Sequence, residues 1–255
     1  MTTTQKLSGT VALVTGASSG IGEATALALA EQGAAVAIAA RRKDRIDALA
    51  ARISDGGGTA LAIEADVTSR EQAQALVEET VAGLGRLDTL VNNAGLMLLG
   101  PIVDAPLEEW ERMIAVNVQG LLYCAHAAVP HLLRAAEDSP RRVTDMVNIS
   151  SVAGRVARNG SGVYNATKWS VGAFSESLRQ EVARRHVRIS LVEPGAVATE
   201  LVSHNRPEIR EQMAGRDDFE RMEAEDIADA IAYIVTRPWR MAVNEMLIRP
   251  TEQER

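Results

Sequence analysis

The stretch Thr10–Gly22, TVALVTGASSGIG, decides the fold class that this sequence predicts. Its first part, Thr10–Thr15, is a short and largely apolar run, as expected for a strand that is covered on both faces. A glycine-rich turn follows at once, and a helical pattern begins at Gly20. Glycines let a backbone turn tightly, and free N–H groups at a helix start bind anions such as pyrophosphate.

The spacing G-x-x-x-G-x-G therefore predicts a phosphate-binding loop, and the alternative is a simple glycine-rich turn before a helix. The residues of this loop that we expect to contact the ligand are Gly16, Ser18, Ser19, Gly20, Ile21 and Gly22.

Strand and helix patterns alternate along the rest of the chain. Strands are expected at Thr10–Thr15, Ala35–Ala40, Ala60–Ala65, Asp88–Asn92, Thr144–Ile149, Arg188–Glu193 and Asn244–Ile248. Helical patterns cover Gly20–Gln32, Lys43–Ile53, Arg70–Leu84, Leu107–Met113, Val118–Ala136, Val163–His186 and Glu225–Thr236. This alternation predicts an α/β fold with a parallel sheet and helices on both faces. No linker divides residues 1–255, so we expect a single domain, with the charged, irregular segment Glu200–Met222 as a substrate loop or lid.

Composition excludes several classes of protein. The 255 residues are 46% hydrophobic and 24% charged, which is typical of a soluble globular protein. A net charge of −7 argues against nucleic-acid binding. The one cysteine, Cys124, excludes an internal disulfide and a cysteine-clustered zinc site, and the histidines show no metal-ligand spacing. The absence of a long apolar run and of a signal peptide predicts no membrane span and a cytoplasmic protein.

The end of the second strand bears on the choice of cofactor. Dinucleotide sites place the adenosine ribose there, where an acidic residue binds the 2′-hydroxyl of NAD and an arginine favours the 2′-phosphate of NADP. Arg41 and Arg42 follow this strand, and no acidic residue stands at Ala39–Lys43. We therefore predict NADP(H) in preference to NAD(H); the alternative is a solvated arginine pair.

The next two strand ends carry residues suited to a close approach of the cofactor. After the third strand, Asp66, with Val67 beside it, accepts a hydrogen bond from the adenine amino group or caps the next helix. The residues after the fourth strand are Asn93, Ala94 and Gly95. Asn92 before them is either a cofactor contact or a structural amide that joins neighbouring strands.

A tyrosine and a lysine carry the catalytic hypothesis. Tyr164 and Lys168 lie four residues apart in a helical pattern and share one helix face. A free phenol has a pKa near 10, and a neighbouring cation favours phenolate, so we expect Lys168, together with a cationic oxidised nicotinamide, to lower the pKa of Tyr164. Ser151, at the end of the fifth strand, can donate to a substrate carbonyl oxygen, with Ser150 as its competitor. Asn117 lies in a helical pattern where asparagine is unfavourable, which suggests a functional cause.

In this order the motifs resemble those of the short-chain dehydrogenase/reductase family, from Leu7 to Ile248. The resemblance implies a doubly wound, Rossmann-like sheet of seven strands and hydride transfer between NAD(P) and a carbonyl or alcohol carbon. It implies that Tyr164 is the general acid/base, that Ser151 rather than Ser150 holds the carbonyl oxygen, and that Lys168 binds ribose.

The same resemblance assigns further roles. Asn117 supports a proton-relay water, and Pro194, Gly195 and Thr199 contact the nicotinamide. One feature of some NADP-binding members is missing, because Ser19 occupies the position where they carry a basic residue.

Three shorter segments, Met97–Pro101, Ser151–Val156 and Ile248–Thr251, are similar to actinomycete NADPH reductases of the clavulanate-aldehyde type and to bacterial 3-hydroxy acid dehydrogenases. This likeness implies a small or medium carbonyl substrate, with a place in secondary metabolism. We expect Met97, Leu99, Val152 and Val156 to form an apolar wall of the substrate pocket. Arg155, and Arg158 after it, are candidates to meet a substrate carboxylate; the alternative is solvated loop arginines.

Two strongly apolar helical patterns, Val118–Ala136 and Val163–His186, predict a homo-oligomer, either a dimer or a tetramer. Two other functions compete with the oxidoreductase. Redox-neutral epimerases and dehydratases that use bound NAD usually carry a longer C-terminal domain and a different glycine spacing. A non-enzymatic dinucleotide sensor does not need Ser151, Tyr164 and Lys168 together.

Overall fold

The strands of the molecule form one parallel sheet. The computed structural model describes residues 5–214 and 218–254. The strands are β1 (Val11–Thr15), β2 (Ala35–Ala40), β3 (Thr59–Glu64), β4 (Thr89–Asn92), β5 (Thr144–Ile149), β6 (Val187–Pro194) and β7 (Glu245–Ile248). Their order is β3-β2-β1-β4-β5-β6-β7, and every neighbouring pair is parallel. The winding direction reverses between β1 and β4, so the predicted doubly wound, Rossmann-like sheet of seven strands is confirmed.

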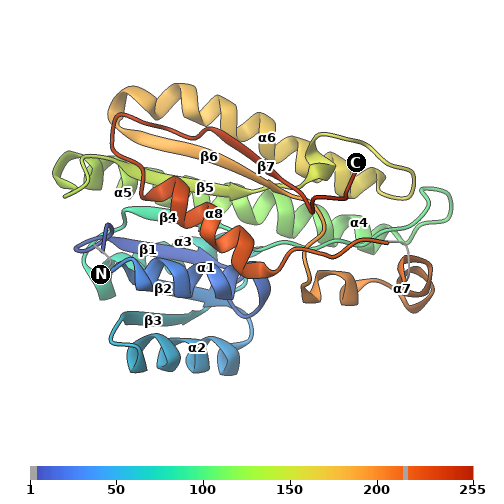
Figure 1. Ribbon diagram of the computed structural model, residues 1–255, viewed down its shortest axis with the longest axis horizontal. Coiled ribbons are helices and arrows are strands. Elements are labelled where there is room, and N and C mark those ends of the chain that lie inside the picture. The colour runs from blue at the N-terminus through green and yellow to red at the C-terminus, as the bar shows by residue number, and fades with distance from the viewer. Residues whose placement is uncertain (1–4, 215–217, 255) are drawn as a thin grey trace.

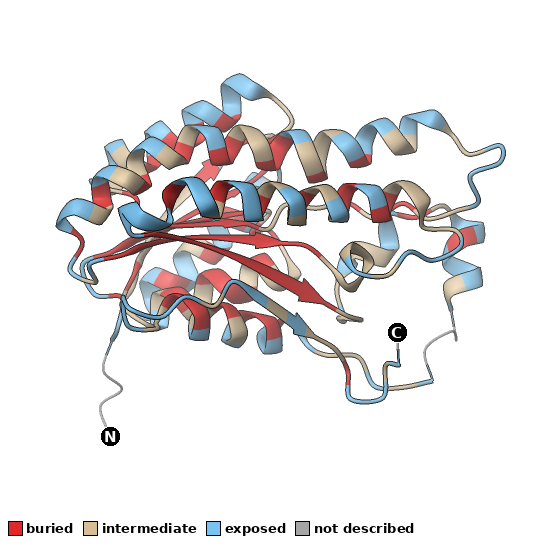
Figure 2. Ribbon diagram, turned by 90° about the horizontal axis from the view of Figure 1, so that it is seen from above, coloured by how far each residue is buried: buried red, intermediate tan, exposed pale blue. Residues whose placement is uncertain are grey.

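Helices cover both faces of this sheet (Figures 1 and 2). They are α1 (Gly20–Glu31), α2 (Lys43–Asp55), α3 (Arg70–Leu84), α4 (Leu107–Ile114), α5 (Leu121–Asp138), α6 (Gly162–Val182), α7 (Pro207–Met213) and α8 (Ala224–Val235). Strand side chains alternate between the faces. Val14 and Ile38 pack with α1, α2 and α8, whereas Leu13 and Leu90 pack with α3, α5 and α6. Two buried layers thus hold the strand ends in fixed positions.

Helices α4 and α5 join through a π-helical turn, Ala115–Gly120, instead of ending separately as the sequence pattern indicated. The continuous stretch Leu107–Asp138 is long and apolar enough to pass a length-and-composition test for a membrane span. Its residues Cys124, Ala125 and Ala128 are buried against the sheet. Because core helices pass the same test, this is weak evidence for a membrane, and the cytoplasmic location stays a prediction.

The predicted irregular segment Glu200–Met222 contains helices. A 3₁₀ helix, η4 (Glu200–His204), leads into α7, and Met222 at the end of the segment pairs with Val197 in an isolated β-bridge. Pro207 suits the first turn of α7, and the buried Ile209 anchors it. We use the term lid segment for Glu200–Met213, which lies beyond the sheet in Figure 1. Residues 215–217 of the predicted loop lie outside the described residues.

Candidate active site

One cavity lies at the carboxyl ends of the central strands. Its volume is about 1440 Å³, above the roughly 300–1,000 Å³ of pockets for a single small ligand. The predicted residues that line it are Gly16, Ser18, Ser19, Gly20, Ile21, Arg41, Arg42, Asp66, Val67, Asn93, Ala94, Gly95, Met97, Leu99, Ser151, Val152, Tyr164, Lys168, Pro194, Gly195 and Thr199. Gly22, Asn117, Arg155 and Val156 are not among its lining residues. The cavity has room for a dinucleotide and a substrate side by side.

The glycine-rich loop is held tightly against the end of β4. Gly16 has a φ of +66°, and a Cβ on it would lie 2.7 Å from the Cα of Ala94. The side-chain amide of Asn93 donates to the carbonyl oxygens of Thr15 (2.9 Å) and Gly16 (3.2 Å). Gly22 lies behind the loop, where a side chain would collide with Asn93. The loop leaves the first turn of α1 open to the cavity, which suits an anion.

The end of β2 contributes arginine to the same cavity. Arg42 donates to the Ser18 hydroxyl (Nε, 3.0 Å; Nη2, 2.8 Å) and to the Ser19 hydroxyl (Nη2, 2.8 Å). Arg41 is exposed and lies 4.0 Å from Asp66. The Asp66 carboxylate accepts hydrogen bonds from Thr68, while Ser69 caps α3, so Asp66 is not the helix cap.

Asn92 has a structural role in this fold. Its amide donates to the side-chain oxygen of Asn148 at 2.9 Å, which ties β4 to β5, and it does not line the cavity. Of the two interpretations open from the sequence, the structure favours the amide that joins strands.

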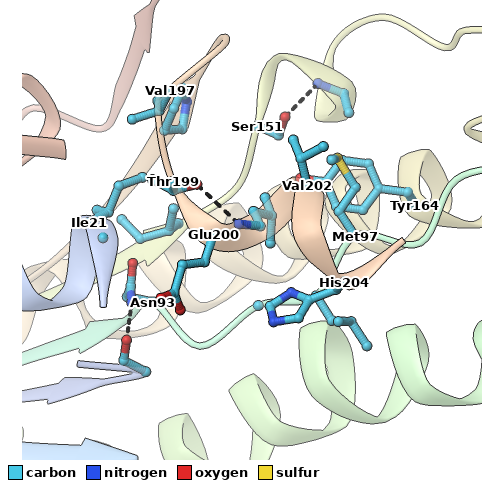
Figure 3. Close-up of a pocket in the computed structure, with 18 of the residues that line it drawn as sticks. Ile21, Asn93, Met97, Ser151, Tyr164, Val197, Thr199, Glu200, Val202 and His204 are labelled. Carbon is cyan, nitrogen blue, oxygen red and sulfur yellow. Dashed lines mark hydrogen bonds between the residues drawn. The ribbon is translucent and has the colours of Figure 1, made fainter. Parts of the chain in front are cut away.

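Three of the four predicted catalytic residues line the cavity: Ser151, which follows β5, and Tyr164 and Lys168 of α6. Tyr164 and Lys168 come from successive turns of α6, with the lysine Nζ 5.8 Å from the centre of the Tyr164 ring. Figure 3 shows Ser151 and Tyr164 at the cavity wall, with Met97 beside the ring. Ser150 donates instead to the Lys168 carbonyl oxygen at 3.1 Å and is buried. Both serines line the cavity, but the Ser150 hydroxyl donates to the backbone of α6, whereas the Ser151 oxygen accepts from the Ala153 N–H at 3.1 Å. The role of Ser151 stays a prediction.

Burial shifts the pKa values of Tyr164 and Lys168 in opposite directions. It raises the pKa of Tyr164 to about 12, and a hydrogen bond with Ser151 acts in the opposite direction. It lowers the pKa of Lys168 to about 8. Lys168 is not among the causes of the raised Tyr164 pKa, and a lowering of the Tyr164 pKa by Lys168 together with an oxidised nicotinamide stays a prediction. The lysine Nζ donates to the Ile149 carbonyl oxygen at 2.9 Å.

Asn117 acts on the site through its neighbours. It lies in the π-helical turn, where its side-chain oxygen accepts from the Leu96 N–H at 2.7 Å. Its amide nitrogen donates to the Leu96 carbonyl (2.8 Å) and the Thr167 hydroxyl (3.1 Å). Asn117 thus joins the loop after β4 to α6. The role in a proton relay stays a prediction.

Arg155 does not face the cavity. Its guanidinium forms ion pairs with the buried Glu193 carboxylate (2.6 Å) and with Glu245, and neither it nor Val156 is a lining residue. The expectation that Arg155 meets a substrate carboxylate and that Val156 forms part of the apolar wall is therefore dropped. Arg158 does line the cavity.

Sequence reasoning missed several lining residues. Glu200 and His204 come from η4, and Gln253 comes from the C-terminal segment, where its side-chain oxygen accepts from the Ala196 N–H at 2.8 Å. The only signal for Glu200 was its place in a predicted lid directly after Thr199. Nothing in the sequence pattern marked Gln253.

Comparisons with known proteins identify the family of this chain. Residues 10–210 match the short chain dehydrogenase family. This chain is a member of that family. Within the short-chain dehydrogenase/reductase family, it is 38% identical to glycine betaine reductase ATRR of Emericella nidulans over 248 residues, 97% of this chain but only 19% of that protein. It is 37% identical to an uncharacterised oxidoreductase of Staphylococcus saprophyticus, over 95% of this chain and 96% of the relative.

Solved structures of family members superpose closely. A 3-ketoacyl-(acyl-carrier-protein) reductase from Brucella melitensis, complexed with NADH, has a TM-score of 0.83 at 30% identity and covers 95% of this chain and 98% of its own. The closed form of a serine dehydrogenase complexed with NADP⁺ has a TM-score of 0.85 at 30% identity and covers 96% of both chains. The chain is therefore an oxidoreductase of this family.

Proposed function

We propose that this protein is an NADP(H)-dependent oxidoreductase that interconverts a carbonyl compound and an alcohol. The observation that carries the proposal is that Ser151, Tyr164 and Lys168 line the same cavity as the glycine-rich loop. A non-enzymatic dinucleotide sensor, by contrast, does not need these three side chains together. The proposed substrate is a small or medium aldehyde or ketone, or the matching alcohol.

The residues present fit a nicotinamide dinucleotide. The open first turn of α1 would hold the pyrophosphate, Asp66 and Val67 the adenine end, and Lys168 the ribose next to the nicotinamide. Gly195 and Thr199 line the same cavity and would contact the nicotinamide. Similar structures that bind NADH and NADP⁺ support this assignment. When bound, the dinucleotide supplies or accepts a hydride.

Side chains of the protein would bind and protonate the substrate oxygen. Ser151 would donate to the carbonyl oxygen, which fixes it beside the Tyr164 hydroxyl. Because burial raises the pKa of Tyr164 to about 12, the phenol is protonated at neutral pH. It is thus ready to give its proton to the alkoxide oxygen as the carbonyl is reduced. In the oxidation of an alcohol the same hydroxyl, deprotonated, would accept the proton of the alcohol.

The choice of cofactor rests on Arg42. We expect NADPH to bind at least tenfold more tightly than NADH, which corresponds to about 1.4 kcal/mol. Arg42→Ala should weaken NADPH binding about tenfold, since one bidentate charged contact to the 2′-phosphate is lost, and should leave NADH within twofold. Calorimetric Kd values measure this, with Arg70→Ala as a control that removes an exposed arginine of α3. Equal binding of NADH and NADPH, unaffected by Arg42→Ala, contradicts the NADP(H) proposal.

A pH profile tests the role of Lys168. Burial lowers its pKa to about 8, so the lysine is a cation below that pH and neutral above it. Since kcat/KM for the cofactor reports groups of the free enzyme, we expect kcat/KM for NADPH to fall above about pH 8. Lys168→Arg keeps the charge and should abolish this alkaline limb, at a lower overall rate. An unchanged limb in that variant would assign the titration to another group.

The assembly expected from the sequence is also a proposal. Leu107, Ile114 and Trp169 are large apolar side chains that are exposed on α4 and α6. Exposed apolar side chains on neighbouring helices support a homo-oligomer, a dimer or tetramer, in which a second copy covers them.

A further inference from the structure

The first residue of the lid segment holds two arginines. The Glu200 carboxylate pairs through Oε2 with Arg42 Nη1 at 2.8 Å and through Oε1 with Arg45 Nη1 at 2.7 Å. The other edge of the Arg42 guanidinium is bonded to Ser18 and Ser19. In this structure every nitrogen of Arg42 therefore already has an acceptor, and one of these acceptors is an anion.

A carboxylate and a phosphate monoester accept hydrogen bonds from the same kind of donor. Both accept paired N–H groups from the planar fork of a guanidinium. Glu200 lies in the wall of the same cavity as Ser18, Ser19 and Arg42. Hydrogen bonds from Arg45 and Arg42 hold the pKa of Glu200 at about 2, so this competing anion is charged throughout the neutral range.

The pair is also able to open. The side chains of Arg42 and Glu200 are 40% and 43% exposed, so water can replace either partner. An exposed ion pair contributes little to stability, roughly 0–1 kcal/mol at the median. A ligand phosphate with two charges and three oxygens is a stronger partner for Arg42 than this carboxylate.

Resting on the NADP(H) site proposed above, we infer that Glu200 is a specificity-determining residue that competes with the cofactor 2′-phosphate for Arg42. NADP(H) must displace the carboxylate, whereas NAD(H) has no 2′-phosphate and leaves the Glu200–Arg42 pair in place. Glu200 therefore lowers the preference for NADP(H) below what Arg42 and the two serines would give alone.

The experiment removes the carboxylate and measures binding without turnover. Calorimetry gives Kd values for NADPH, NADH, adenosine 2′,5′-bisphosphate and 5′-ADP with wild type, Glu200→Gln and Glu211→Gln. Glu211 is an exposed residue of α7 that does not line the cavity, so its variant controls for the loss of one negative charge from the lid segment. We expect Glu200→Gln to tighten NADPH and the 2′,5′-bisphosphate at least fivefold and to leave NADH and 5′-ADP within twofold. Glu211→Gln should change all four less than twofold.

Each result decides the inference. An unchanged or lower NADPH-to-NADH ratio in Glu200→Gln overturns it. Unchanged 5′-ADP binding shows that the variant is folded. If Glu200→Gln and Glu200→Ala both lose 5′-ADP binding, the Glu200–Arg42 ion pair is needed to hold the binding site together, and the inference fails. A wild type that prefers NADH while Glu200→Gln shifts towards NADPH contradicts the proposed NADP(H) preference but supports the competition. A wild type that prefers NADPH with no shift in Glu200→Gln leaves the proposed function standing and the inference refuted.

Discussion

Tyr164→Phe is expected to lower kcat for carbonyl reduction about a thousandfold, because a positioned general acid contributes roughly 10²–10⁴ to the rate. The ring of Tyr164 is buried beside Leu96, Leu98 and Met113, and phenylalanine preserves this packing. Only the proton donor is lost. The Kd for NADPH should therefore stay within twofold of wild type, which separates a defect in chemistry from a defect in binding.

Steady-state kinetics and calorimetry on the same preparations test this result. Tyr233→Phe is the matched control, because Tyr233 lies on α8, is 43% exposed and does not line the cavity. Its kcat should equal that of wild type. Turnover by Tyr164→Phe within tenfold of wild type would remove Tyr164 from the proposed acid/base role.

The fold could be predicted because buried parallel strands leave a strong local pattern. The predicted strands Ala35–Ala40 and Thr144–Ile149 coincide with β2 and β5. Helix ends were harder to place. The pattern that was predicted to run to His186 ends as α6 at Val182, and His186 turns the chain with a φ of +60°. No glycine marks that turn, so the residue pattern contains no signal for the end of the helix.

Site residues could be predicted from the sequence where they belong to a short local motif at the carboxyl end of a strand. The loop from Gly16 to Ile21, Ser151 and the Tyr164–Lys168 pair all line the cavity, because parallel strands bring their carboxyl ends to one edge. Arg155 shows what local sequence patterns cannot predict. The sequence pattern placed it correctly after β5, but its partners Glu193 and Glu245 come from β6 and β7. A side chain's direction depends on such distant partners, which no local spacing contains.

Protonation could not be predicted for the same reason. Four-residue spacing placed Lys168 near Tyr164, but the depth of the cavity and the Ile149 carbonyl decide what that proximity does. Burial, which depends on the whole fold, sets the pKa of both groups.

A buried ion cluster at the other end of the sheet carries the second large effect. Asp145, the second residue of β5, is fully buried and accepts from Arg188 Nε (2.7 Å), Arg188 Nη2 (3.0 Å) and Arg141 Nη1 (2.8 Å). Asp145→Asn keeps the shape but leaves two guanidinium groups facing an uncharged amide. Removing one partner of a buried ion pair costs about 3–5 kcal/mol, so we expect a loss of about 3 kcal/mol in the free energy of unfolding.

Urea unfolding at equilibrium measures this loss as a lower midpoint with an unchanged slope. The matched control is Glu176→Gln, which removes the carboxylate from an exposed pair with Arg179 on α6 and should leave the midpoint unchanged. Asp145 does not line the cavity, so folded Asp145→Asn should retain the kcat of wild type. A free energy of unfolding within about 1 kcal/mol of wild type would mean that Arg188 finds sufficient partners in the carbonyl oxygens of Val235 and Met241, to which it also donates. The cluster would then be replaceable, and the stability of this end of the sheet would rest on its apolar layers alone.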